Sequence, residues 1–227
     1  MITPTKEFWE VFKSTPGALS TAEALAIMNI AAQAPDGLFL ELGTHKGKSA
    51  LAASIGLNRE YVFGKTPIEL NRFYLVDPIF SDKEIYDELN RTLHWHKFNI
   101  QYFPTTNTSL EVIKPLLDVE QKKGYAYVFS DAGSHSDELP MREVKELEDL
   151  IIPNGIICFH DVFSQFVKQT EAYEYLLYTG KYEPIEINWQ EIFDYVAEHD
   201  LEEGNNSWHL YPELPHPPNF VGALKRK

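Results

Sequence analysis

A nine-residue stretch of the chain combines a carboxylate with two glycines and several hydrogen-bonding side chains. It runs from Glu41 to Ser49 (ELGTHKGKS) and continues a short apolar run. Gly43 and Gly47 allow a tight turn and let the backbone approach a ligand closely. The helix expected after this turn begins with unpaired backbone N–H groups, which can also bind a ligand. The stretch therefore indicates a ligand-binding turn, with an ordinary strand-to-helix connection as the alternative.

Other polar residues follow the later apolar runs. Asp77 follows FYLV, Asp131 follows YAYVFS, and the pair His160 and Asp161 follows IICF. In open α/β sheets ligands bind beyond the carboxyl ends of the strands, so these side chains are expected to meet there. Two carboxylates and an imidazole suit a cation such as Mg²⁺ or Mn²⁺, and an imidazole can also accept a proton. The simpler alternative is that His160 and Asp161 only cap their strand.

The elements that position these residues alternate along the chain. Short runs of apolar and β-branched residues are expected to be strands, and segments with helical periodicity are expected to be helices. The expected strands are 37–42, 73–76, 100–103, 125–130, 156–159, 182–187 and 220–224, and the expected helices are 21–34, 48–57, 110–117 and 137–150. Near-continuous apolar strands that alternate with helices predict a parallel sheet covered on both faces.

The length of 227 residues and the apolar content of 44% predict one domain, spanning residues 1–227. Within it, residues 1–35 are expected to form a helical cap or lid, and residues 182–227 are expected to supply the closing strands. The segment 58–72 is longer than a simple connection between a helix and a strand and indicates an insertion. The acidic segment 189–206 is expected to be solvated or to form a lid.

The charge and cysteine content exclude several classes of protein. A formal net charge of −14 offers no surface for phosphates. The single cysteine, Cys158, rules out an intramolecular disulfide and fits a reducing compartment. The N-terminus does not have the pattern of a signal peptide, and no apolar run reaches the length of a membrane span. We therefore expect a cytoplasmic protein with neither a nucleic-acid nor a membrane partner.

The spacing of the two glycines distinguishes three kinds of nucleotide-binding loop. A P-loop has four residues between its first glycine and the Gly-Lys-Ser, but Gly43 and Gly47 enclose three. The dinucleotide fingerprint Gly-x-Gly-x-x-Gly is absent from residues 44–49. The remaining pattern, E-x-G-x-x-x-G-x-S, is that of the class I methyltransferases and fits at every fixed position.

Over roughly residues 17–165, the chain resembles the class I S-adenosylmethionine-dependent methyltransferases. It is similar to the branch whose fourth strand ends in D-G-x-H and whose fifth strand follows P-G-G and ends in H-D, near the metal-dependent small-molecule and sugar O-methyltransferases. The matching stretches are SDAGSH (130–135) and IPNGIICFHD (152–161), which depart from the pattern at Ala132 and Asn154 but keep flexible turns. The resemblance implies a Rossmann-like α/β fold: a doubly wound, mostly parallel sheet of seven strands with helices on both faces.

The resemblance also implies roles for individual residues. The residues that would bind S-adenosylmethionine are Glu41, Gly43, Thr44, Gly47, Ser49, Asp77, Ser109 and Asp131. Among them, Asp77 would bind the ribose and Ser109 would lie beside the adenine. The catalytic residues would be Asp131, His135 and His160. Mg²⁺ or another divalent cation would be held by Asp131, His160 and Asp161, with His135 as an alternative third ligand or base.

Together these features predict an S-adenosylmethionine-dependent methyltransferase that modifies a hydroxyl of a small-molecule acceptor. The alternatives are a P-loop NTPase, a dehydrogenase, a protein of the cephalosporin-hydroxylase type and a non-catalytic member that binds the cofactor. Three aromatic residues, Phe8, Trp9 and Phe12, precede the expected core. They indicate either a homodimer interface or a lid.

Overall fold

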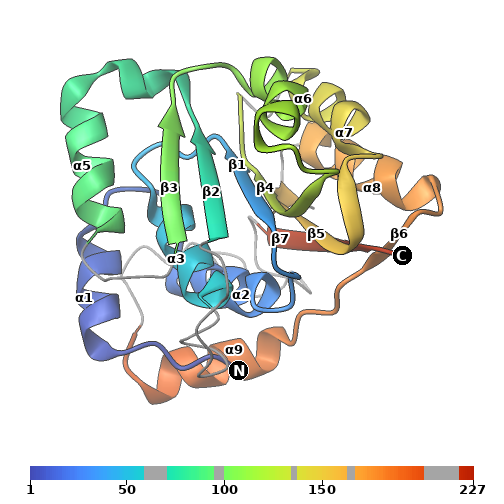
Figure 1. The fold of residues 1–227 in the computed structure, drawn as a ribbon. Helices are drawn as coiled ribbons and strands as arrows, with labels where there is room; N and C mark the ends of the chain where they lie inside the picture. Colours follow the sequence, from blue (N-terminus) through green and yellow to red (C-terminus); the bar gives the residue numbers. More distant parts are fainter. Residues whose placement is uncertain (59–70, 95–99, 134–136, 163–166, 202–219) are drawn as a thin grey trace.

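Seven strands form one sheet, and helices cover both of its faces (Figure 1). The computed structural model describes residues 1–58, 71–94, 100–133, 137–162, 167–201 and 220–227. The strand order is β3-β2-β1-β4-β5-β7-β6. The predicted Rossmann-like, doubly wound α/β fold is confirmed.

The described strands and helices follow the order expected from the alternating pattern. The strands are β1 (Leu38–Leu42), β2 (Asn71–Val76), β3 (Ile100–Thr105), β4 (Tyr125–Ser130), β5 (Ile151–Val162), β6 (Tyr182–Pro184) and β7 (Phe220–Arg226). The helices are α1 (Lys6–Ser14), α2 (Thr21–Ala31), α3 (Lys48–Leu57), α5 (Lys83–Leu93), α6 (Ser109–Glu120), α7 (Leu139–Leu147), α8 (Val167–Tyr178) and α9 (Trp189–Glu198). A short 3-10 helix, η1 (Pro78–Ser81), follows β2.

The direction of the strands brings the polar strand ends together. Strands β3, β2, β1, β4 and β5 are parallel to one another. Strand β7 lies between β5 and β6 and is antiparallel to both. Because β1, β2, β4 and β5 are parallel, their carboxyl ends lie at one edge of the sheet, where ligands of such folds bind.

The sheet separates two apolar cores. Successive side chains of a strand point to opposite faces, so Phe39 of β1 packs in one core with residues of α2 and α3. Its neighbours Leu38 and Leu40 pack in the other core with residues of α6, α7 and α8. Burial on both faces explains why the central strands are apolar without alternation.

The acidic segment 189–206 differs from the expectation of a solvated chain. Its first half forms α9, in which Ile192, Tyr195 and Val196 are buried in the first core. In the sequence, the acidic residues between these positions made the apolar face of the helix difficult to recognise. Residues 202–206 of this segment, and residues 59–70 of the predicted insertion, lie outside the described part of the chain.

The aromatic residues of the N-terminal segment are buried within this chain. Phe8, Trp9 and Phe12 lie on α1 and are between 0% and 5% exposed. They pack against one another in the core that also contains α2 and α3. Intrachain packing therefore accounts for these aromatics, and the homodimer stays a prediction without their support. Among the described helices, none is long and apolar enough to cross a membrane.

Candidate active site

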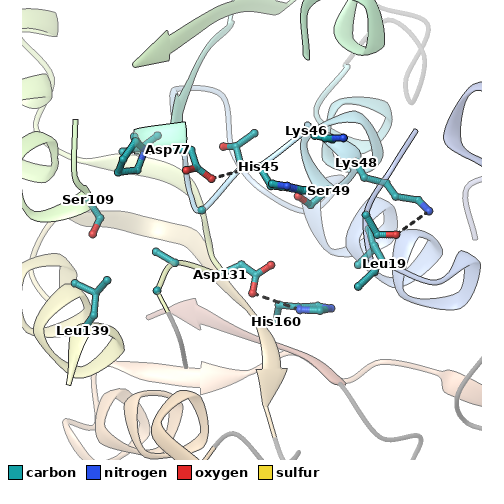
Figure 2. A pocket seen from close by; sticks show the side chains of 18 of the residues that line it. Leu19, His45, Lys46, Lys48, Ser49, Asp77, Ser109, Asp131, Leu139 and His160 are labelled. Atoms are coloured by element: carbon teal, nitrogen blue, oxygen red, sulfur yellow. Dashed lines mark hydrogen bonds and ion pairs between the residues drawn. The ribbon is translucent and has the colours of Figure 1, made fainter. Parts of the chain in front are cut away.

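A cavity of about 550 Å³ lies at the carboxyl ends of β1, β2, β4 and β5 (Figure 2). The predicted site residues that line it are Gly43, Thr44, Ser49, Asp77, Ser109, Asp131 and His160. Figure 2 shows Asp77, Ser109 and Leu139 towards one end and Lys48 and Leu19 towards the other, with Asp131 between them. The structure therefore brings most of the predicted site residues to one elongated cavity. His135 lies outside the described residues.

The carboxylate of Glu41 lies beneath the cavity wall. Glu41 is fully buried, and its Oε1 accepts a 2.7 Å hydrogen bond from Oγ of Ser49. Burial, together with the nearby charges of Asp131 and Asp77, outweighs this hydrogen bond and raises the pKa of Glu41 to about 8. The Thr44 hydroxyl lies near enough to favour the ionised form, yet neither Oε2 of Glu41 nor Oγ1 of Thr44 has a hydrogen bond of acceptable geometry to the described residues.

Replacement of this buried carboxylate is expected to change how stability depends on pH. The folded chain retains a proton on Glu41 between pH 4.5 and about 8 that the unfolded chain loses, so stability falls as pH rises through this window. Each pKa unit between the folded and the unfolded chain corresponds to about 1.4 kcal/mol of stability. Glu41→Gln is therefore expected to be more stable than the wild type by a few kcal/mol at pH 9, and by little at pH 4.5. Urea unfolding across this pH range measures the difference, and the exposed Glu183→Gln is the control. If the difference in unfolding free energy between Glu41→Gln and the wild type does not grow with pH, the raised pKa of Glu41 is contradicted.

The two glycines of the turn have different surroundings. Both have a φ of +86°, in the left-handed region that favours glycine. A Cβ on Gly43 would overlap the backbone carbonyl of Asp131 and lie 2.8 Å from Cα of Ala132. A Cβ on Gly47 would instead meet the side chain of Leu89 on α5. Gly43 thus brings the first turn against the end of β4, whereas Gly47 begins α3 away from the cavity lining.

The carboxylate of Asp77 fixes the turn after β1 as well as facing the cavity. Its Oδ2 accepts a 2.7 Å hydrogen bond from the backbone N–H of His45, and its Oδ1 accepts one of 3.0 Å from that of Ile79. Asp77 is half-buried and contributes to the cavity wall. Two backbone N–H groups therefore orient the carboxylate of Asp77, which also faces the cavity.

Ser109 does not cap its helix. The N-cap of α6 is Thr108, whose backbone N–H and hydroxyl both donate to Oε2 of Glu111. The Ser109 hydroxyl instead lies beside Glu143, which also accepts a 3.2 Å hydrogen bond from Ser130. Burial raises the pKa of Glu143 to about 7, against the effect of these two hydroxyls. Ser109 is therefore the first residue of α6 and not its N-cap.

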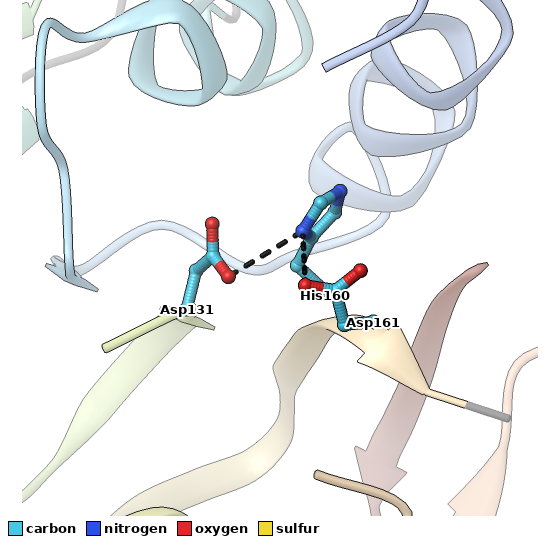
Figure 3. A group of neighbouring side chains, drawn as sticks. All are labelled: Asp131, His160 and Asp161. Atoms are coloured by element: carbon cyan, nitrogen blue, oxygen red, sulfur yellow. Dashed lines mark ion pairs between the residues drawn. The ribbon is translucent and has the colours of Figure 1, made fainter. Parts of the chain in front are cut away.

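Three potential metal ligands meet at the ends of β4 and β5 (Figure 3). Asp131, His160 and Asp161 each offer a ligand atom within 4.8 Å of the other two. Nδ1 of His160 lies 3.4 Å from Oδ1 of Asp131 and 3.3 Å from Oδ2 of Asp161. This separation suits atoms that share one cation at about 2.0–2.3 Å each. The donors therefore fit a divalent cation.

A bulge in β5 explains how two consecutive residues reach the same place. In a regular strand, His160 and Asp161 would point to opposite faces. The pairing of β5 with β7 shifts between Phe159 and Val162, and Asp161 has a φ of +58°. Bulges re-aim side chains, and strained backbone of this kind is frequent at functional sites. The bulge is consistent with the contact between the two side chains.

Carboxylates surround the imidazole of His160 on both sides. Its Nε2 lies 3.2 Å from Oε1 of Glu23, which comes from α2. Burial disfavours the charged imidazolium, but the carboxylates of Asp131, Asp161 and Glu23 outweigh burial and hold the pKa of His160 well above its usual range. No signal in the sequence connects Glu23 with His160, because Glu23 is recognisable there only as an acidic residue in the first turn of a helix.

The structure also adds residues to the cavity wall that the sequence did not single out. The segment 16–19, just before α2, lines one end of the cavity. Lys48 lines the same end: its Nζ lies 4.5 Å from the centre of the Phe12 ring and donates to the carbonyl oxygen of Gly17 at 3.4 Å. The N-terminal segment therefore forms part of the site.

A protein-family model described as a methyltransferase domain matches residues 40–162, more than half of the chain. The chain belongs to this methyltransferase family. The matched region includes the turn after β1 and the ends of β4 and β5. The methyltransferase assignment excludes the P-loop and dinucleotide alternatives.

Solved structures share the fold of this methyltransferase. A protein from Corynebacterium glutamicum has a TM-score of 0.58 and 14% identity, with coverage of 99% of this chain and 91% of that one. Cofactor-bound Rv0187 from MTB has a TM-score of 0.56 and 14% identity, covering 97% and 87% of the two chains. CalS11, a TDP-rhamnose 3'-O-methyltransferase of calicheamicin biosynthesis, has a TM-score of 0.55 and 12% identity, covering 100% and 96%. The comparison of this chain with curated protein sequences found no match.

Proposed function

We propose that this methyltransferase modifies a hydroxyl oxygen of a small molecule with the help of a divalent cation held by Asp131, His160 and Asp161. The observation that carries the proposal is the meeting of these three side chains next to the cavity. Two carboxylates and an imidazole in this arrangement suit Mg²⁺ or Mn²⁺. The sugar acceptor in the name of CalS11 agrees with this class of substrate.

The cavity is suited to the chemical groups of the cofactor. Asp77 presents oriented acceptors at one end, where a ribose diol would donate hydrogen bonds. Ser109 and Leu139 lie beyond it, where an adenine would pack. At the first turn, the Ser49 hydroxyl donates to the buried Glu41, and Ser49 itself lines the cavity. Glu41 would thus act on the methionine end through Ser49.

The chain contributes mainly position and electrostatics to the reaction. S-adenosylmethionine supplies the methyl group when it is bound, and a divalent cation supplies a positive charge that lowers the pKa of the acceptor hydroxyl. Methyl transfer is an in-line displacement, so the gain comes from holding the reacting atoms close together and aligned. Asp131 lines the cofactor cavity and is also one of the proposed cation ligands, so it would align the two. In a reaction without a cation, His135 would accept the acceptor's proton, because the carboxylates around His160 keep its imidazole charged.

Replacement of Asp77 tests the cofactor site. Loss of an ionised hydrogen-bond acceptor costs about 1.5–3 kcal/mol, so Asp77→Ala is expected to weaken S-adenosylhomocysteine binding by about 10- to 100-fold. Isothermal titration calorimetry measures the affinity directly. Asp82→Ala is the matched control, because Asp82 also accepts from backbone N–H groups at a helix start but does not line the cavity. Equal affinities of the two variants contradict the assignment of Asp77.

The cation and the acceptor are tested by turnover. Methyl transfer from radiolabelled cofactor to a panel of sugars, sugar nucleotides and phenols is measured with Mg²⁺, with Mn²⁺ and with EDTA. We expect transfer to a hydroxylated acceptor that EDTA suppresses and either cation restores. Turnover that EDTA leaves unchanged contradicts the cation, and transfer to amines alone contradicts the choice of oxygen.

A further inference from the structure

Glu23 contacts both its own helix cap and the imidazole of His160. Its Oε2 accepts hydrogen bonds from the backbone N–H of Ser20 at 2.8 Å and from the Ser20 hydroxyl at 2.7 Å. Its Oε1 lies 3.2 Å from Nε2 of His160, although 137 positions separate the two residues. Both side chains are buried, with exposed fractions of 7% and 8%. The carboxylate is therefore held in place by its cap and points at the imidazole.

The two nitrogens of His160 face different partners. Nδ1 faces the proposed cation ligands Asp131 and Asp161, and Nε2 faces Glu23. A neutral imidazole that ligates a cation through one nitrogen carries its proton on the other, and a carboxylate that accepts this proton fixes the ring and its tautomer. Oε1 of Glu23 occupies the position that such an acceptor requires.

We propose that Glu23 is a positioning residue that holds the proton of His160 on Nε2, so that the Nδ1 lone pair points at a cation shared with Asp131 and Asp161. The inference rests on the proposed cation site. It also gives the N-terminal segment a role, because Ser20 directly follows residues 16–19, which line one end of the cofactor cavity. One carboxylate thus connects the cofactor cavity with the cation ligands.

The test measures Mn²⁺ binding to the full-length chain, without turnover. Electron paramagnetic resonance gives the Mn²⁺ affinity in the presence of S-adenosylhomocysteine. Loss of a carboxylate that orients a ligating histidine typically weakens metal binding 10- to 100-fold, and we expect this for Glu23→Ala. Glu23→Gln keeps an acceptor oxygen but loses the charge, so its affinity is expected to lie between those of Glu23→Ala and the wild type.

The second capping box of the chain supplies a matched control. Glu111 caps α6 through Thr108 as Glu23 caps α2 through Ser20, but it is exposed and forms no described contact with His160. Glu111→Ala therefore removes the same kind of cap and is expected to leave Mn²⁺ affinity unchanged. Thermal unfolding and calorimetric S-adenosylhomocysteine binding establish that each variant is folded and keeps its cofactor site.

The outcomes separate this inference from the proposed function. If the wild type binds Mn²⁺ and Glu23→Ala binds it equally well, the role of Glu23 is overturned while the cation site stands. If Glu111→Ala loses as much affinity as Glu23→Ala, the effect belongs to helix capping and the role is again overturned. A wild type that binds neither Mn²⁺ nor Mg²⁺ overturns the cation site and this inference together.

Discussion

Asp131→Asn is expected to abolish detectable Mn²⁺ binding and to slow methyl transfer by about 10²- to 10⁴-fold, the usual range for loss of a positioned catalytic group. Asp131 lies at the end of β4, lines the cavity, and has its Oδ1 3.4 Å from Nδ1 of His160. Asparagine has the same shape but lacks the charge. The loss should therefore fall on kcat, whereas S-adenosylhomocysteine affinity should change by much less.

Single-turnover rates with the acceptor identified by the panel, together with Mn²⁺ titration, measure this effect. Asp118→Asn is the control, since Asp118 is exposed on α6 and does not line the cavity. If Asp131→Asn retains more than about a tenth of the wild-type rate, Asp131 is a structural residue rather than a catalytic one.

Gly43→Ala is expected to destabilise the fold and to remove cofactor binding. A left-handed conformation costs a non-glycine residue about 1–2 kcal/mol. The added Cβ would also overlap the carbonyl of Asp131, and such overpacking costs about 1–3 kcal/mol more. Backbone cannot rotate away as a flexible side chain can, so the turn and the end of β4 must separate. Because both line the cavity, we expect a loss of S-adenosylhomocysteine affinity of at least about 100-fold.

Differential scanning fluorimetry and calorimetric titration measure these two effects. The expected fall in Tm is about 5–15 °C for a chain of this size. Gly180→Ala separates conformation from contact, because Gly180 has a similar φ of +71° but no atom within 4 Å of its added Cβ. Gly180→Ala should therefore lose only the conformational part and bind normally. If Gly43→Ala and Gly180→Ala change Tm and S-adenosylhomocysteine affinity equally, the close approach of Gly43 to Asp131 is contradicted.

Local patterns along the chain determined the fold class and the positions of the main site residues. Apolar runs, helical periods and turn residues are properties of neighbouring positions, so they predicted β1, β2, β4 and α3 to within a few residues. Parallel strands bring their carboxyl ends to one edge of a sheet. For this reason Gly43, Asp77 and Asp131 could be assigned to one site before their distances were known.

Only the tertiary structure decided the features that depend on packing between distant segments. Glu23 meets His160 across 137 positions because α2 packs beside β5, and no periodicity encodes such a contact. The bulge near the end of β5 arises from its pairing with β7, which comes from the far end of the chain. Burial is likewise a property of the whole fold, and it is the largest of the effects that raise the pKa of Glu41 to about 8. The sequence determined which chemical groups the site contains, and packing determined their protonation and the direction in which they point.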